Sequence, residues 1–251
     1  MWIGNDPSSS TDTASNNVAV GTTALDAITT GDSNVAVGYN TGTAVTSGAS
    51  NVLVGHSAGL ALEAGNYNVA VGTLALAAED GHGKNVAIGY GALQVQDAGA
   101  DAFNIGIGFN AGTSVSNGIR NIIIGGNAGD ALTTANDNTI IGYNAGTAMI
   151  SSAESVLIGK DAGLSLTTGH YNVAIGDSAL NTEDSGGKNV AIGKSALASL
   201  NAGGDGNNVA IGYRAGLNMS TGLHNVIVGS EAGDALTSGL RNVAIGWDAL
   251  G

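Results

Sequence analysis

The stretch NVAVGTTALDAITTGDS, from Asn17 to Ser33, is followed directly by NVAVGYNTGTAVTSGAS, residues 34–50. Both strings share the leading Asn, the Val-Ala-Val triplet, the Gly that follows it and a second Gly ten residues later. Related strings begin at residues 17, 34, 51, 68, 85, 104, 121, 138, 155, 172, 189, 208, 225 and 242. Self-similarity at a short fixed period is the signature of a solenoid, so repetition decides the fold of this chain.

The spacing of these strings is 17 residues, except that the strings beginning at Asn85 and Asn189 are 19 residues long. Those two lie 104 residues apart (189 − 85), so a block of six coils is itself repeated. Gly4 lies 17 residues before Gly21, which places a partial coil over residues 1–16. The sequence therefore predicts a single array over residues 1–251. We expect the array to begin and stop within a coil, and open strand edges of this kind favour end-to-end assembly.

Each coil, numbered from its Asn as position 1, has Gly at position 5 and usually at position 15. Glycine suits turns with positive φ and close approaches of backbone. Two turns divide a coil into two short strands, and 17 residues are too few for a pair of helices. The pattern predicts an all-β parallel β-solenoid, or β-roll, with two short strands per coil.

Side chains alternate along a strand, so positions 2 and 4 share one face and position 3 points to the other. Positions 2 and 4 are Val or Ile in every coil except at Thr139, and we expect them to fill the interior together with the apolar residues at position 12. Position 3 is never polar, and a strand that is apolar on both faces is typically covered on both. We therefore expect position 3 to form the interface between copies of the chain, through Ala19, Ala36, Leu53, Ala70, Ala87, Ile123, Ile140, Leu157, Ala174, Ala191, Ala210, Ile227 and Ala244.

The charge and composition of the chain argue against several classes of function. The formal net charge is −13, which repels nucleic acid and anionic lipid surfaces, and no apolar run approaches membrane-spanning length. The chain has no Cys, and its four His residues occupy different coil positions, so no ligand set for a metal or cofactor is predicted. Acidic residues cluster in turns, where we interpret them as solvated charges. No cluster of acids or bases interrupts the repeat in the way that a catalytic site requires.

Six of the ten aromatic residues follow the Gly at position 5. Aromatic rings stack on sugars, so this edge is the candidate for contact with a glycan, although packing over the turn is the alternative role. The six residues are Tyr39, Tyr90, Phe109, Tyr143, Tyr213 and Trp247. Thr and Ser also recur at positions 13 and 14, as in Thr29 and Thr30, and this leaves an ice-binding solenoid as a second alternative.

The string N-V-A-I-G-x-x-A with a Gly at the second turn resembles the head repeats of trimeric autotransporter adhesins. It is also similar to the N-T-A-[IV]-G-x-x-A-L repeats of phage tail fibres. The resemblance covers nearly the whole chain, and it implies a β-roll with threefold symmetry on the cell surface or the virion. The 17-residue period is longer than that of a typical adhesin head.

Together these features predict a non-enzymatic segment of a fibre or adhesin, a homo-oligomeric rod located outside the cell or on a virion. Its expected partners are further copies of itself, as a homotrimer, and a cell-surface glycan. The least favoured alternative is a solenoid enzyme that acts on polysaccharide.

Overall fold

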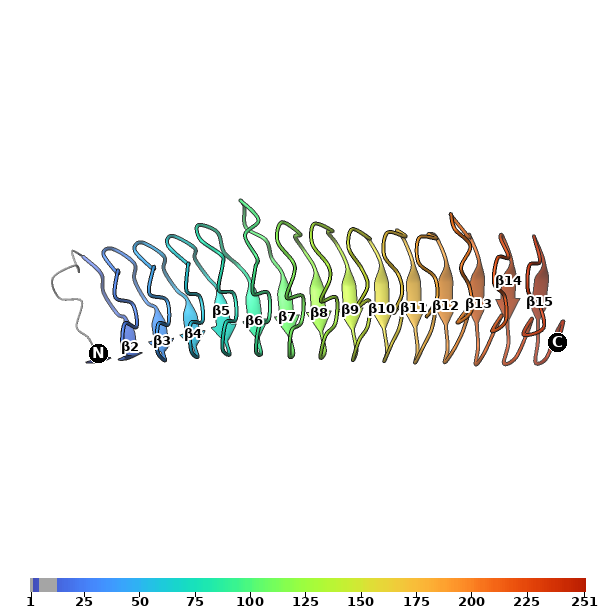
Figure 1. Cartoon of the computed structure of the whole chain (residues 1–251), viewed down its shortest axis with the longest axis horizontal. Helices are drawn as coiled ribbons and strands as arrows, with labels where there is room; N and C mark the ends of the chain where they lie inside the picture. The colour runs from blue at the N-terminus through green and yellow to red at the C-terminus, as the bar shows by residue number, and fades with distance from the viewer. Residues whose placement is uncertain (1, 5–12) are drawn as a thin grey trace. The chain divides into compact units, whose positions relative to one another are not determined.

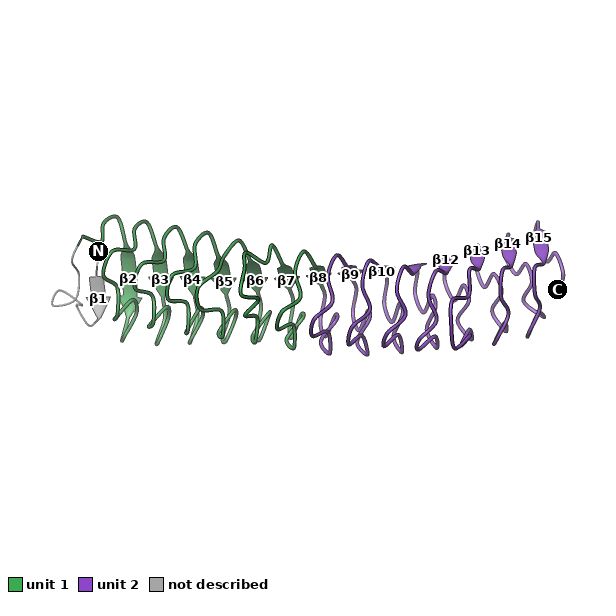
Figure 2. Ribbon diagram, turned by 90° about the horizontal axis from the view of Figure 1, so that it is seen from above, with its two compact units in different colours: residues 1–124 green, residues 125–251 purple. Residues whose placement is uncertain are grey.

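The computed structural model describes residues 2–4 and 13–251 of the chain. The described residues form short strands and turns and contain no helix, hence none that could cross a membrane. The chain divides into two compact units, residues 1–124 and 125–251 (Figure 2). Unit 1 contains β1 (Trp2–Gly4), β2 (Val18–Gly21), β3 (Val35–Val37), β4 (Val52–Val54), β5 (Val69–Val71), β6 (Val86–Ile88), β7 (Ile105–Ile107) and β8 (Ile122–Ile124). Unit 2 contains β9 (Thr139–Ile141), β10 (Val156–Ile158), β11 (Val173–Ile175), β12 (Val190–Ile192), β13 (Val209–Ile211), β14 (Val226–Val228) and β15 (Val243–Ile245).

Within each unit consecutive strands pair in parallel, one coil after the next (Figure 1). The register joins equivalent positions, so that Ala19 lies opposite Ala36 and Ala174 opposite Ala191. Every strand from β2 to β15 begins at the second residue of a coil. Gly4 of β1 pairs with Gly21 of β2 in the same parallel register.

Each described coil holds one strand, and the prediction of a second strand is wrong. The limb after the Gly at position 5 contains residues with left-handed backbone at positions 7 and 9, for example Asn40 with φ 53° and Gly42 with φ 56°. A left-handed residue bends the chain out of the extended conformation. Backbone hydrogen bonds still join this limb to the next coil, as between the Thr29 N–H and the Thr46 carbonyl oxygen at 2.9 Å. The limb is thus a stack of turns.

The interior is lined by position 3, so the expected arrangement of the two strand faces is wrong. Every residue assigned to the interface is enclosed within its own coil, with at most 2% of its surface exposed: Ala19, Ala36, Leu53, Ala70, Ala87, Ile123, Ile140, Leu157, Ala174, Ala191, Ala210, Ile227 and Ala244. Positions 2 and 4 point outward, and Val52, Ile88 and Ile122 are between 37% and 40% exposed. A residue closed off inside one chain has no surface to offer to another.

The size of the side chains explains why position 3 faces inward. Where position 3 is Ala, position 9 is often a buried Leu, as in Ala70 with Leu76. Where position 3 is large, position 9 is Gly, as in Leu53 with Gly59. A Cβ atom added to Gly59 would lie 2.9 Å from the Leu53 side chain. The two positions therefore fill the same space, and in most coils one large side chain per pair keeps the interior closely packed. Where both are small, as in Ala36 with Gly42, Leu side chains of the neighbouring coils lie next to the Gly.

The buried Asn at position 1 joins consecutive coils. The Oδ1 atom of Asn51 accepts a hydrogen bond from the Asn68 N–H at 2.8 Å, and its Nδ2 atom donates to the Gly65 carbonyl oxygen at 2.9 Å. The same contacts recur along the array, for example from Asn189 N–H to Asn172 Oδ1 at 3.0 Å. One side chain thus pairs two buried backbone groups, which would otherwise be costly to remove from water.

Candidate functional site

The outward face of the strands is a row of branched apolar side chains. Only Thr139 interrupts the Val and Ile residues at positions 2 and 4 of β2 to β15. We call this row the Val/Ile face. The seven strands β2–β8 of unit 1 stack over about 34 Å and give a face of about 340 Å², and β9–β15 of unit 2 give another of similar size. Parallel sheets are normally covered on both sides, so a face of this composition is unusual on a free surface.

Positively charged residues border the Val/Ile face. The chain has seven Lys and Arg residues. Two of them, Lys160 and Lys194, follow the Gly at position 5, and four occupy the place just before the buried Asn, so six of the seven lie next to a strand end. The four are Lys84, Arg120, Lys188 and Arg241, and all six side chains are exposed. Positions 10 to 13, away from the strands, carry nine acidic residues and no cation, so the strand side is the less negative side of the coils.

The predicted aromatic edge is exposed along the same border. Tyr39, Tyr90, Phe109, Tyr143, Tyr213 and Trp247 are between 47% and 76% exposed. The rings stack on one another between coils: Tyr90 and Phe109 lie 5.3 Å apart between centroids, and Tyr39 stacks on His56 at 5.4 Å. The edge is therefore open to a ligand. The hydroxyls at position 13 are less free, because Thr29, Thr133 and Thr167 each donate to a carbonyl oxygen of the next coil.

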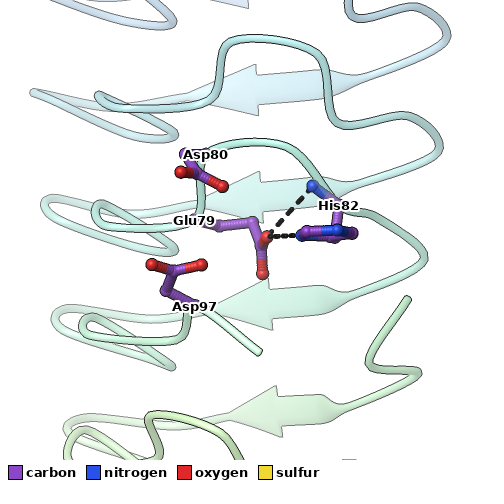
Figure 3. Close-up of side chains that lie close together, drawn as sticks. All are labelled: Glu79, Asp80, His82 and Asp97. Carbon is purple, nitrogen blue, oxygen red and sulfur yellow. Dashed lines mark hydrogen bonds and ion pairs between the residues drawn. The ribbon is translucent and has the colours of Figure 1, made fainter. Parts of the chain in front are cut away.

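A cluster of titratable side chains lies where the turns of two consecutive coils of unit 1 meet. The sequence predicts only solvated acids and a scattered His there. Glu79, Asp80 and His82 come from the segment between β5 and β6, and Asp97 comes from the segment between β6 and β7 (Figure 3). Each of the four offers an oxygen or nitrogen atom, and these atoms all lie within 4.8 Å of one another. No pocket is found within residues 2–4 and 13–251.

Glu79 is the buried member of the cluster. It stands at position 12, where other coils place Leu62 or Leu166 in the interior, and none of its surface is exposed. Its Oε1 atom accepts a hydrogen bond from the His82 backbone N–H at 3.2 Å, and Asn85 Nδ2 approaches Oε2 at 3.5 Å. Burial, together with the smaller effects of the nearby carboxylates of Asp97, Asp80 and Asp101, raises the pKa of Glu79 to about 7, against the opposing effect of the His82 backbone hydrogen bond.

The cation nearest in sequence is already engaged. Lys84 Nζ lies 2.6 Å from Asp101 Oδ2 and 5.0 Å from the centre of the Phe103 ring. His82 Nδ1 lies 3.7 Å from Glu79 Oε1, is closed off from solvent and has no hydrogen-bond partner. The cluster thus combines three carboxylates with an imidazole nitrogen that is turned toward the buried one.

The signal that points to this cluster in the sequence is the Glu at position 12. An acidic residue at an otherwise apolar interior position marks a buried carboxylate, and buried carboxylates need partners. The other three His residues are placed differently: His56 stacks on Tyr39, His170 Nδ1 accepts a hydrogen bond from the Ala153 N–H at 3.0 Å, and His224 lies on the exposed row before Asn225. Sequence periodicity alone did not bring His82 and Asp97 together.

Comparison of the chain with protein-family models, with curated proteins and with solved structures found no match.

Proposed function

We propose that this chain is a non-enzymatic structural segment of a homo-oligomeric fibre or adhesin, held together through the Val/Ile face. The single observation that carries the proposal is the outward row of Val and Ile residues on β2–β15. Each unit offers about 340 Å² of this face, an apolar area of the size that on a monomer often marks an interaction site. The proposal places the assembly on a cell surface or a virion.

The distribution of charge around this face is compatible with a second copy of the chain as the partner. The chain carries a net charge of −13, so two copies repel each other over most of their surfaces. The strand side carries six of the seven cations, four of which form ion pairs with Asp residues of the same chain, and this neutralisation reduces the repulsion there. β-branched side chains in register offer a regular surface for such packing. The number of copies in the assembly is taken as three, from the resemblance to trimeric adhesins.

The exposed aromatic edge supports a second candidate function, the binding of a glycan. The Tyr90–Phe109 pair presents two stacked rings to solvent, and such rings suit the apolar faces of sugars. This function is compatible with the first, because an adhesin needs both an assembled rod and a surface for a receptor.

The interface is tested by two outward substitutions, Val69→Lys and Val173→Lys, one in each unit. Burial of two ammonium groups in an apolar contact is costly, so we expect the double variant to keep its circular dichroism spectrum and to fall to the 24.4 kDa of a single chain in light scattering. The matched control carries the same two charges on exposed turn residues, as Ser47→Lys with Thr168→Lys, and should keep the mass of the parent. A monomeric parent, or a double variant with the parent's mass, would rule out this interface.

A further inference from the structure

We propose that Glu79, Asp80, His82 and Asp97 bind one divalent transition-metal ion, of the kind represented by Zn²⁺, in unit 1. This site is independent of the Val/Ile face, because its residues lie in the segments that follow β5 and β6 and not on the strands. The solenoid register creates it, since Glu79 at position 12 of one coil is followed by Asp97 at position 13 of the next. Figure 3 shows Asp80, His82 and Asp97 arranged around Glu79.

The spacing of the ligand atoms is close to what a bound ion requires. They lie within 4.8 Å of one another, whereas oxygen and nitrogen ligands about 2.1 Å from a tetrahedral Zn²⁺ are roughly 3.4 Å apart. Asp80 and Asp97 are exposed, so their carboxylates are able to rotate inward by the required amount. Glu79 and the backbone around it then remain in place.

Because Glu79 is buried, a bound cation would stabilise its carboxylate. The carboxylate is fully enclosed, and the two other acidic members of the cluster add negative charge beside it. Lys84, the neighbouring cation, forms its ion pair with Asp101. A buried negative charge is stable when it is paired or coordinates a metal, so a divalent ion would compensate the three carboxylates together.

His82 indicates which ions the site prefers. Its Nδ1 atom is shielded from solvent, lacks a hydrogen-bond partner and faces Glu79, so it is available as a ligand in the neutral imidazole form. Imidazole nitrogen suits Zn²⁺ and its neighbours in the transition series, whereas Ca²⁺ and Mg²⁺ prefer oxygen ligands only. A site with one nitrogen and three carboxylates therefore favours Zn²⁺ over Ca²⁺.

The equivalent segment in the second six-coil block lacks two of the four ligands. The residues 104 positions later are Glu183, Asp184, Gly186 and Asn201, so the imidazole and one carboxylate are missing. Glu183 is equally buried, but its oxygens accept hydrogen bonds from the Gly186 N–H at 2.7 Å and the Ala202 N–H at 3.0 Å. The buried Glu thus accepts two backbone hydrogen bonds in unit 2, whereas Glu79 accepts one, from the His82 N–H, and lies beside the His82 ring and two further acids.

The test uses tag-free full-length protein, treated with EDTA and dialysed, and isothermal titration with ZnCl₂. We expect one Zn²⁺ per chain and a melting temperature that rises with ZnCl₂ and returns with EDTA. The double variant His82→Gly with Asp97→Asn converts the cluster into the residues of the second block, which the chain already folds, and should lose affinity by about tenfold or more. CaCl₂ is expected to bind more weakly than ZnCl₂ to the parent.

A further variant separates loss of the site from loss of the fold. Glu79→Leu places at position 12 the residue that stands there as Leu62 and Leu166, so it should fold, melt at or above the temperature of the metal-free parent and show no response to ZnCl₂. The proposal is overturned if the parent takes up no Zn²⁺. It is equally overturned if the His82→Gly, Asp97→Asn variant binds Zn²⁺ as tightly as the parent, or if CaCl₂ binds the parent more tightly than ZnCl₂.

Discussion

At the scale of single residues, the Asn at position 1 carries the connection between coils. Asn51 pairs one backbone N–H and one backbone carbonyl that lie in different coils, and it is fully buried. Its recurrence was readable in the sequence, because an amide that both donates and accepts suits a stack of identical turns. Ser155, which replaces Asn in one coil, keeps only part of this role: its Oγ accepts from the Asn172 N–H at 3.2 Å.

Asn51→Ala is expected to lower the free energy of unfolding by about 2–6 kcal/mol, since it leaves two buried backbone groups without partners at about 1–3 kcal/mol each. Asn51→Ser, which copies Ser155, should cost clearly less because the hydroxyl still accepts one hydrogen bond. Urea denaturation followed by circular dichroism gives both values. Equal losses for the two variants would show that the side-chain hydrogen bonds are not the source of the stability.

The direction in which the strand residues face was the part of the fold that the periodicity could not decide. Alternation shows that positions 2 and 4 oppose position 3, but both sets are apolar, so polarity gave no preference. The sizes of the side chains at positions 3 and 9 indicate that position 3 faces inward. Ala70 occurs with Leu76 and Leu53 with Gly59, and such compensating sizes indicate a shared interior space. The candidate metal site was hidden for a related reason: its members occupy different coil positions, and Glu79 is its one member at an interior position.

At the scale of one structural element, the Gly at position 5 ends each strand and determines how closely coils stack. Gly55 has φ 135°, and a Cβ atom built on it would lie 2.7 Å from the backbone of Gly72. Both the left-handed conformation and the close approach exclude a side chain. The sequence predicted these turns correctly, and it predicted one strand of each coil, but the left-handed residues at positions 7 and 9 could not be inferred because many of them are not Gly.

Gly55→Ala should therefore destabilise unit 1 by about 3 kcal/mol or more, through backbone strain and contact with the next coil. Gly126→Ala is the control, because its φ is not in the left-handed region and its nearest neighbour would be the Tyr143 ring at 3.4 Å. The midpoints of urea unfolding are the measurement. Similar midpoints for both variants would contradict the role given to the Gly at position 5.

At the scale of the whole molecule, the net charge of −13 opposes association and the Val/Ile face favours it. Salt screens the electrostatic repulsion between copies and hardly affects the apolar contact between their Val/Ile faces. We expect the fraction of oligomer in light scattering to rise as NaCl increases from about 20 mM, where the Debye length is roughly 20 Å, to about 500 mM, where it is roughly 4 Å. A fall in the oligomeric fraction over this range would show that ion pairs, and not apolar contacts, dominate the interface.

Among the described strands, each contacts only the strands of the adjacent coils. Each coil therefore packs only against its two neighbours, and any coil with the same pattern of residues can take the place of a neighbour. Recombination between the gene segments that encode the 104-residue blocks would then add or remove six coils and leave the packing between adjacent coils unchanged. Length becomes a trait that varies between descendants of one gene, while the stability of each remaining coil stays the same.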